Sequence, residues 1–286
     1  MHTSPVDKIL TTFLLMLPAR LIARCVYGLS RSRIPWLKNS LIKVFLAFYN
    51  VNTAEADRPV PTGYVSFNDF FTRELKPGAR PLAGNSGNIL CPADGTLVQA
   101  GKIIAGELVQ AKGMTYTAQS LLGDAQFATR LADSAFATVY LAPYNYHRVH
   151  MPLDGKLTST RFIPGKLYSV NARTTANIPN LYAANERLVC FFEGTRGPFA
   201  MVLVGAMNVA SISTAWAGEI LPGRYGLPVH HVYSADEGME FNAGDYMGHF
   251  NLGSTVILLG PPGSLNWDAG IQPGVAVQMG EQMGRF

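Results

Sequence analysis

Beyond residue 80 the chain is divided into short apolar runs, and glycine, proline or asparagine separates most of them. Runs of about five residues rich in valine, isoleucine and aromatic side chains are typical of β-strands. A helical period is largely confined to residues 118–131. The predicted strands include residues 89–90, 96–98, 102–104, 137–141, 188–192 and 199–204. We therefore predict an α+β protein, in which N-terminal amphipathic helices precede a mostly antiparallel, β-rich domain of barrel or sandwich type.

A further strand is predicted at residues 256–259, and a glycine and a serine stand just before it. The apolar run Val-Ile-Leu-Leu stops at Gly-Pro-Pro, which favours a buried strand over a helix. Gly253 can adopt backbone angles that are closed to other residues, so its peptide bond to Ser254 could be strained and its carbonyl accessible. Taken alone, the pair is explained more simply as a loop that ends in a hydroxyl side chain.

The densest group of reactive side chains lies between Pro143 and Pro152, where His147 and His150 stand three positions apart. The two prolines favour an extended or looped backbone, and in a strand this odd spacing points the two rings to opposite faces. Neutral histidine is the usual side chain for moving protons near pH 7. Each histidine could therefore serve a different catalytic task, although two structural histidines are the alternative.

The remaining candidate residues are isolated. Asp94 lies in an Asp-Gly turn between two predicted strands and could simply shape that turn. Lys166 could contact an anionic head group, and His249 is expected in a solvent-exposed loop. The His-x-x-His spacing lacks the features of a zinc peptidase motif and the cysteines are not paired, so no metal site is expected.

The first 60 residues differ from the rest in charge. Asp7 is the only acid before Glu55, whereas the bases in this region are Lys8, Arg20, Arg24, Arg31, Arg33, Lys38 and Lys43. One helical face collects Leu37, Leu41, Val44, Phe45 and Phe48, with Lys38 and Lys43 off it. Basic amphipathic helices suit a membrane surface that carries anionic lipid, and packing on the main domain is the alternative. Residues 52–62 are polar and contain proline, and are expected to form a hinge.

The apolar run at residues 9–17 is interrupted too early for a spanning helix, which needs about 20 apolar residues. It is also a poor signal peptide, because the basic start is thin and no good cleavage site follows. We therefore expect attachment to a membrane surface instead of insertion.

Composition excludes some classes of function. Hydrophobic residues make up 48% and charged residues only 15%, whereas charged residues are typically about a quarter of a soluble domain. This surplus suggests an apolar surface kept for a membrane or a partner. A net charge of +4, without a dense basic run, does not suggest nucleic-acid binding. The three distant cysteines are expected to be free thiols in a reducing compartment.

A serine, a histidine and an aspartate can form a set of nucleophile, base and orienting group. Together with the His-Arg-Val-His and Leu-Gly-Ser-Thr runs, the sequence from about residue 20 onward closely resembles the bacterial phosphatidylserine decarboxylase proenzymes, which are pyruvoyl-dependent. The resemblance includes the stretches at residues 67–77, 92–95, 110–113, 146–152, 185–187 and 252–255. Cys91 stands where serine is common, and Tyr246 where an acid often precedes Met-Gly, but neither departure touches the inferred chemistry.

The resemblance implies that the chain cuts itself between Gly253 and Ser254. Ser254 would attack the carbonyl of Gly253, with His150 taking its proton and Asp94 orienting His150. The resulting ester would eliminate the Gly253 carboxylate, and hydrolysis of the dehydroalanine would release ammonia and leave a pyruvoyl group. The large chain would be residues 1–253 and the small chain residues 254–286, held in the sheet by its apolar strand.

A pyruvoyl group derived from Ser254 would form a Schiff base with the substrate amine and accept electrons as the carboxylate leaves. We assign His147 as the acid that then protonates Cα, because its ring is expected to face away from that of His150. The implied substrate is phosphatidylserine in the membrane and the implied product is phosphatidylethanolamine.

These inferences give residues 1–60 as a membrane-associating region and residues 61–286 as the catalytic domain, peripheral on the cytoplasmic face of the inner membrane. A homodimer is one arrangement that the sequence leaves open. Two other functions remain as alternatives. The same Ser254, His150 and Asp94 could hydrolyse an external ester or amide, or the chain could be a lipid-binding module without activity.

Overall fold

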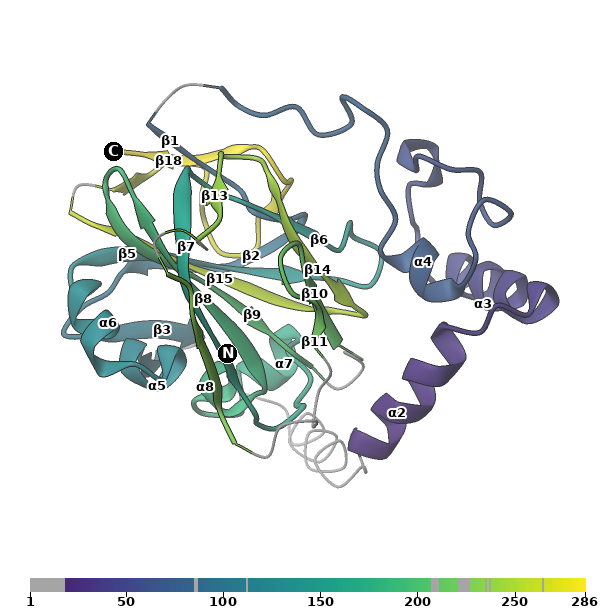
Figure 1. Cartoon of the computed structure of the whole chain (residues 1–286), viewed down its shortest axis with the longest axis horizontal. Coiled ribbons are helices and arrows are strands. Elements are labelled where there is room, and N and C mark those ends of the chain that lie inside the picture. Colours follow the sequence, from purple (N-terminus) through teal and green to yellow (C-terminus); the bar gives the residue numbers. More distant parts are fainter. Residues whose placement is uncertain are drawn as a thin grey trace.

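The structure is a computed structural model that describes residues 19–84, 87–111, 113–206, 211–220, 227–234, 236, 238–263 and 265–286, with only the backbone of residues 19–22 and 254. The apolar run at residues 9–17 lies outside the described residues. The class is α+β, as predicted, with mostly antiparallel sheets and an N-terminal helical region. Figure 1 shows α2, α3 and α4 together at one end of the β-rich body, with α5 and α6 at the other.

A nine-stranded sheet organises the molecule. It runs through β12 (Val229–Val232), β7 (Gly155–Ile163), β8 (Arg187–Gly194), β9 (Gly197–Val204), β15 (Ser254–Pro262), β5 (Ser134–Leu141), β2 (Gly95–Lys102) and β17 (Ala276–Val277), and β13 (Glu240–Phe241) pairs with β7. All of its pairings are antiparallel. Over the described residues the sheet stays open from β12 to β17, so it does not close into a barrel.

Smaller sheets pack around this one. The four-stranded sheet joins β11 (Gly218–Ile220), β10 (Ser211–Thr214), β14 (Tyr246–Asn251) and β6 (Arg148–His150), and so brings the histidine motif beside the residues that precede Gly253. A three-stranded sheet joins β1 (Asn88–Leu90), β18 (Gln282–Arg285) and β16 (Asn266–Trp267), and β3 (Glu107–Ala111) pairs with β4 (Met114–Thr117).

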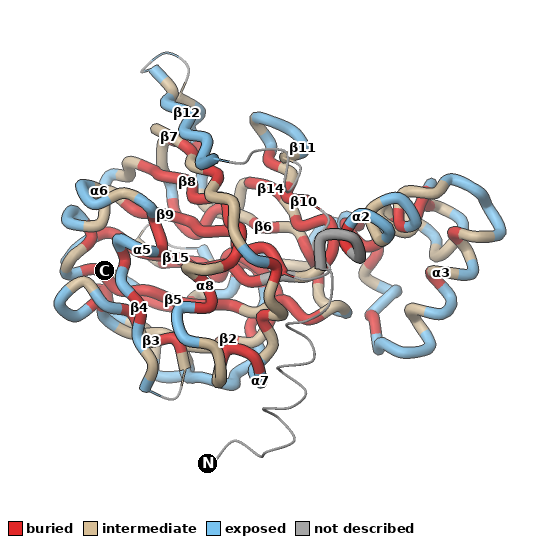
Figure 2. Tube along the Cα trace, turned by 90° about the horizontal axis from the view of Figure 1, so that it is seen from below, coloured by how far each residue is buried: buried red, intermediate tan, exposed pale blue. Residues whose placement is uncertain are grey.

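The core explains why some strands could be read from the sequence. β15 lies between β9 and β5, and its residues Val256, Ile257, Leu258 and Leu259 are at most 1% exposed. A strand buried on both faces is continuously apolar, and β8 and β9 show the same pattern. Figure 2 shows the buried residues concentrated along these strands. The predicted strand at residues 102–104 is wrong, because β2 ends at Lys102.

Both β9 and β5 belong to the part of the chain before Gly253, and they pair with β15 on its two sides. The C-terminal segment is tied in again by β17, which pairs with β2, and by β18, which pairs with β1. A segment that begins at residue 254 is therefore paired with the preceding chain at four places.

The helices are short apart from the first two. They are α2 (Ala19–Ser30), α3 (Pro35–Phe48), the 3-10 turn η1 (Thr53–Glu55), α4 (Phe67–Phe71), α5 (Ala118–Leu122), α6 (Ala125–Arg130), α7 (Ala172–Thr175) and α8 (Leu181–Ala184). α5 and α6 confirm the helical period predicted at residues 118–131. α3 begins with a proline at its first helical position, where no backbone N–H is needed.

An aromatic cluster joins α3 to α4. The Phe45 ring lies 5.3 Å from Phe67, 6.3 Å from Phe70 and 6.0 Å from Phe71, measured between ring centroids. Ile42 and Tyr64 complete this cluster and are almost fully buried. The predicted boundary near residue 60 therefore runs through a shared apolar core.

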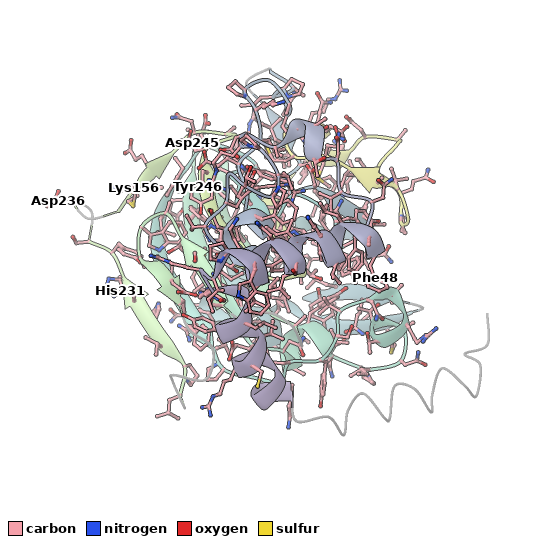
Figure 3. The ribbon with its side chains drawn as sticks, turned by 90° about the vertical axis from the view of Figure 1, so that its right-hand side faces the viewer. Phe48, Lys156, His231, Asp236, Asp245 and Tyr246 are labelled. Carbon is pink, nitrogen blue, oxygen red and sulfur yellow. The ribbon has the colours of Figure 1, made fainter. Side chains whose placement is uncertain are left out.

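The outer surface of α3 exposes three large apolar side chains. Trp36 is 70% exposed, Val44 55% and Phe48 79%, and the exposed Ser40 lies between Trp36 and Val44 on the same side of the helix. Figure 3 looks onto this end of the molecule and labels Phe48 at the end of α3. Of the apolar face predicted here, Val44 and Phe48 point outward, and Lys38, which was placed off that face, is buried and donates to the carbonyl of Pro61. In the described part of the chain, every helix is too short or too polar to cross a membrane.

Candidate active site

The predicted cleavage point lies in a two-residue link between two strands. β14 ends at Asn251 and β15 begins at Ser254. Leu252 has a φ of 85° and Gly253 a φ of 41°, so both residues are in the left-handed region. For a leucine this conformation costs on the order of 1–3 kcal/mol. The peptide that was predicted to be strained is thus preceded by backbone strain at Leu252.

His147 lies just before β6 and is almost completely enclosed, with 1% of its surface exposed. Its Nδ1 donates a hydrogen bond to the carbonyl of Asn145 at 2.9 Å, because a carbonyl can only accept. Nε2 therefore has a lone pair, and it has no partner among the described residues. Burial, with a smaller contribution from the neighbouring Arg73, lowers the pKa of His147 to about 3. His147 is therefore a neutral imidazole with one nitrogen available.

The wall against His147 is Phe71, whose ring centroid lies 4.0 Å from that of the imidazole. Phe71 also lines an apolar cavity of about 360 Å³, together with Phe45, Phe67, Leu252 and Gly253. This cavity thus lies between the N-terminal helices and the link that precedes Ser254.

His150 occupies a more polar position in β6. Its Nδ1 donates to the carbonyl of Gly244 at 2.8 Å, which leaves Nε2 to accept from the Tyr146 hydroxyl at 3.0 Å. The Tyr246 ring lies beside it, with ring centroids 6.0 Å apart. Burial lowers the pKa of His150, while the charge of Asp94 opposes this shift. His150 is therefore a neutral base whose tautomer is fixed by a backbone carbonyl.

Asp94 is buried and has strong partners of its own. Arg80 donates to both of its carboxylate oxygens, and the Arg80 Nη2 to Asp94 Oδ2 distance is 2.6 Å. The backbone N–H of Met279 also donates to Oδ1 at 2.9 Å. The same guanidinium binds Glu55 at 3.0 Å. Asp94 thus belongs to an ion-pair network and not only to a turn.

The structure brings Asp94 and His150 near enough for their charges to interact, but not into the hydrogen bond that was expected between them. Both ring nitrogens of His150 and both oxygens of Asp94 are bonded to other groups. The structure describes only the backbone of Ser254, so the distance from its hydroxyl to His150 is not described.

Two other sequence-based assignments have clear outcomes. His249 is not in a solvent-exposed loop, since it lies in β14, where its Nδ1 is paired with the Tyr246 hydroxyl. Burial lowers the pKa of His249 to about 4. Lys166 is exposed, and its backbone is hydrogen-bonded to Ala184 and Glu186.

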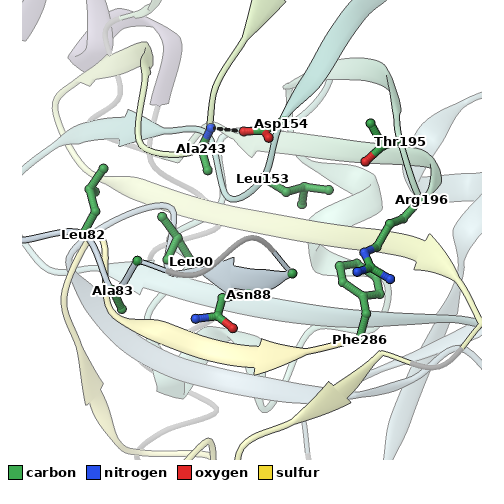
Figure 4. A pocket seen from close by; sticks show the side chains of 12 residues that line it. Leu82, Ala83, Asn88, Leu90, Leu153, Asp154, Thr195, Arg196, Ala243 and Phe286 are labelled. Carbon is green, nitrogen blue, oxygen red and sulfur yellow. Dashed lines mark hydrogen bonds between the residues drawn. The ribbon is translucent and has the colours of Figure 1, made fainter.

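Sequence reasoning missed the groups that set the environment of the site. Arg80, Tyr146 and Gly244 contact Asp94 or His150, and Arg80 and Gly244 lie outside the motifs that the sequence analysis singled out. The Tyr146 position inside the histidine motif was the only available signal. Figure 4 shows a separate cavity of about 360 Å³ beside the C-terminal Phe286, which contains none of the predicted site residues.

Comparisons with known proteins identify the family of this chain. A family model described as phosphatidylserine decarboxylase matches residues 67–285, and a second, described as PSD, matches residues 9–50. The phosphatidylserine decarboxylase proenzyme of Methylococcus capsulatus is 45% identical over 278 residues, which is 97% of this chain and 96% of the relative. Proteins of the same name from Stutzerimonas stutzeri and Azotobacter vinelandii are 46% and 47% identical, and cover 98% and 94% of this chain and 95% of each relative. The chain belongs to the phosphatidylserine decarboxylase family.

Proposed function

We propose that this chain cuts itself between Gly253 and Ser254, and then decarboxylates phosphatidylserine to phosphatidylethanolamine with a pyruvoyl group made from Ser254. Family membership supports the reaction, and one structural observation supports the position of the cut. The link Leu252-Gly253 is held in left-handed geometry between β14 and the buried β15. Breaking the bond after Gly253 would relieve that strain while β15 stays paired with β9 and β5.

The cut requires a base for the Ser254 hydroxyl. His150 is neutral, and the Gly244 carbonyl holds its proton on Nδ1, so Nε2 is the basic atom. Tyr146 occupies Nε2 and would give way to Ser254. Ser254 Oγ attacks the Gly253 carbonyl carbon, the C–N bond breaks, and His150 returns its proton to the new amine. Asp94 supports the positive charge on His150 in between, since its charge raises the pKa of that ring.

The ester then breaks by loss of the Ser254 α-proton and departure of the Gly253 carboxylate, and water releases ammonia from the residue left at position 254. The keto group that results supplies an electron sink for the carbanion formed at Cα of the substrate. The apolar cavity beside Gly253 fits this chemistry, because a site of low polarity favours loss of a carboxylate charge as carbon dioxide.

His147 is proposed as the group that protonates Cα. With its pKa lowered to about 3, it cannot begin as an acid near neutral pH. The negative charge of a bound substrate would raise the pKa of this ring, and Nε2 would then take the proton that the substrate ammonium loses and return it to Cα after carbon dioxide leaves. The ring packs on Phe71, which lines the apolar cavity.

The substrate would reach the site from a membrane surface. The exposed stripe of Trp36, Val44 and Phe48 on α3 suits insertion among lipid head groups, with basic residues around it. We accordingly propose residues 1–60 as the membrane-associating region and residues 61–286 as the catalytic domain, peripheral on the cytoplasmic face of the inner membrane. The large and small chains, 1–253 and 254–286, remain partners, and a homodimer is one assembly open to them.

Intact-mass measurement tests this function directly. The purified chain should give two species that break after Gly253, and the smaller one should carry a carbonyl that reacts with a hydrazine. The same sample should release carbon dioxide from vesicles that contain phosphatidylserine. Ser254→Ala, the matched control, should remain one inactive chain. A single uncut chain with an intact Ser254 would refute the proposal and leave a hydrolase or a lipid-binding module.

A further inference from the structure

Asn251 is the last residue of β14 and is fixed on both sides of its amide. Nδ2 donates to Ser211 Oγ at 2.8 Å and to Ser213 Oγ at 2.9 Å, and both serines lie on the neighbouring strand β10. Oδ1 accepts from Asn68 Nδ2 of α4 at 2.8 Å. The residue is 2% exposed. Three hydrogen bonds therefore hold the amide in one orientation inside the protein.

The network continues to the end of α2. Ser211 Oγ accepts from Asn251 and from Arg31 Nη2, the latter at 3.2 Å, and donates to the Glu219 carboxylate. This uses the one donor and both acceptor positions of a hydroxyl. Arg31 also forms an ion pair with Glu219, and its guanidinium lies 3.7 Å from the centre of the Tyr27 ring. A continuous set of side-chain contacts thus joins α2 to Asn251.

Asn251 lies directly before the two-residue link that precedes the scissile bond, so this network fixes one end of that link. On one side of the scissile link, hydrogen bonds fix Asn251. On the other side, β15 is fixed by β9 and β5. Only Leu252 and Gly253 lie between these anchors, and both are in the left-handed region. A Cβ atom added at position 253 would have no atom of the described residues within 4 Å, apart from its chain neighbours, so the backbone angle and not space accounts for the glycine.

We propose that Asn251 is a positioning residue for the cut at Gly253, and that α2 and α4 form part of the cleavage site through it. Asn68 acts directly on the amide, and Arg31 acts through Glu219 and Ser211. This inference rests on the proposed cleavage between Gly253 and Ser254. It implies that α4, which packs on the apolar-faced α3 through the Phe45 ring, takes part with α2 in holding the scissile carbonyl in place.

A small displacement of a reacting group is expected to have a large effect, since an error of about 1 Å can cost about 100-fold in rate. Asn251→Ala removes all three hydrogen bonds and should slow the cut by about 10-fold to 100-fold. Arg31→Ala and Glu219→Ala loosen Ser211 only indirectly and should each slow it about 3-fold to 10-fold. Because these two residues act as one pair, the double variant should be no slower than the worse single variant.

The experiment follows cutting of the full chain by intact mass after rapid synthesis, with the unfolding temperature of each variant measured on a Ser254→Ala background. Arg130 and Glu193 provide the matched control, since they form an ion pair of 2.6 Å on another part of the surface. Arg130→Ala with Glu193→Ala should cut at the unaltered rate. Equal rates for the Arg31 and Glu219 variants and this control would overturn the role of α2.

Treatment with hydroxylamine distinguishes slow attack of Ser254 on Gly253 from slow breakdown of the ester that this attack forms. It attacks the ester carbonyl, which gives a hydroxamate on Gly253 and frees the Ser254 hydroxyl and amine, so any accumulated ester becomes two chains. Asn251→Ala should stay uncut with hydroxylamine, because the attack of Ser254 itself is slowed. Conversion to two chains, or a cut at the unaltered rate, would overturn the inference. An uncut unaltered protein would instead refute the proposed function.

Discussion

The two histidines of the motif stand three positions apart, and their surroundings differ in almost every respect. His147 packs against Phe71, which lines the apolar cavity, and its Nε2 has no partner among the described residues and its pKa is about 3. His150 has both nitrogens bonded, and the charge of Asp94 opposes the effect of burial on its pKa. One residue type thus acquires two reactivities from its environment. We expect the self-cleavage to depend on the polar side of this motif and the decarboxylation on the apolar side.

The sharpest test of this division is His150→Ala. Nε2 of His150 is the base proposed for the Ser254 proton, so the cut should be abolished and decarboxylation with it. Intact mass should show one uncut chain, folded as judged by its unfolding temperature. If His150→Ala yields the two chains at the unaltered rate, the base lies elsewhere.

His147→Gln should separate the two reactions. The variant should cut itself normally, because His147 is not needed for the attack on Gly253. Its decarboxylation rate should fall by about 10²-fold to 10⁴-fold, the usual contribution of a positioned acid or base. Carbon dioxide release from phosphatidylserine vesicles measures this, normalised to the fraction of cut chain. Full activity in the cut variant would contradict the assignment of His147.

Asp94→Asn tests the charge that supports His150. The amide keeps an oxygen to accept from the Met279 N–H, but it removes the negative charge that raises the pKa of His150. A weaker base should slow the cut by about 10-fold to 100-fold, following the usual range for acid–base groups. Raising the pH should not restore the rate, since His150 is already neutral. A rate equal to that of the unaltered chain would leave Asp94 as a structural partner of Arg80.

The features that could be predicted from the sequence are those that depend on a local residue pattern. The continuous apolar run revealed β15, because a strand buried on both faces carries no polar alternation. The histidine spacing suggested two different environments. The sequence did not reveal that Arg80 would bind Asp94 or that the Gly244 carbonyl would hold His150, since these contacts join residues 14 and 94 positions apart. The sequence also did not reveal which side of α3 would be exposed. Lys38 is buried because it donates to the Pro61 carbonyl, which belongs to another segment.

The apolar surroundings of His147 include α4, which packs on α3, and α3 carries exposed apolar side chains on its outer surface. Replacing both Trp36 and Phe48 with serine should weaken binding to anionic vesicles by about 10-fold or more, since a large apolar side chain gains about 1.5–3 kcal/mol when it leaves water. Decarboxylation in vesicles should fall in parallel, whereas the cut should be unchanged because it takes place within one chain. Leu227→Ser with Val232→Ser, at exposed residues of another surface, provides the control. Unchanged vesicle binding would place the membrane surface elsewhere.

The smallest expected effect concerns stability and pH. His147 has its folded-state pKa lowered from 6.5 to about 3, so between these values the unfolded chain binds a proton that the folded chain does not. Stability is therefore complete above about pH 6.5 and declines as the pH falls below it. From pH 7 to pH 5.5 this one group should cost about 1 kcal/mol, given about 1.4 kcal/mol per pH unit for a full proton. Urea unfolding at both pH values, on a Ser254→Ala background that stays one chain, measures the loss. Adding His147→Gln should remove that part of it. His150→Gln should remove less, because the hydrogen bond to the Gly244 carbonyl and the nearby carboxylates oppose the effect of burial there. An equal pH dependence with and without His147 would mean that its ring is not enclosed as described.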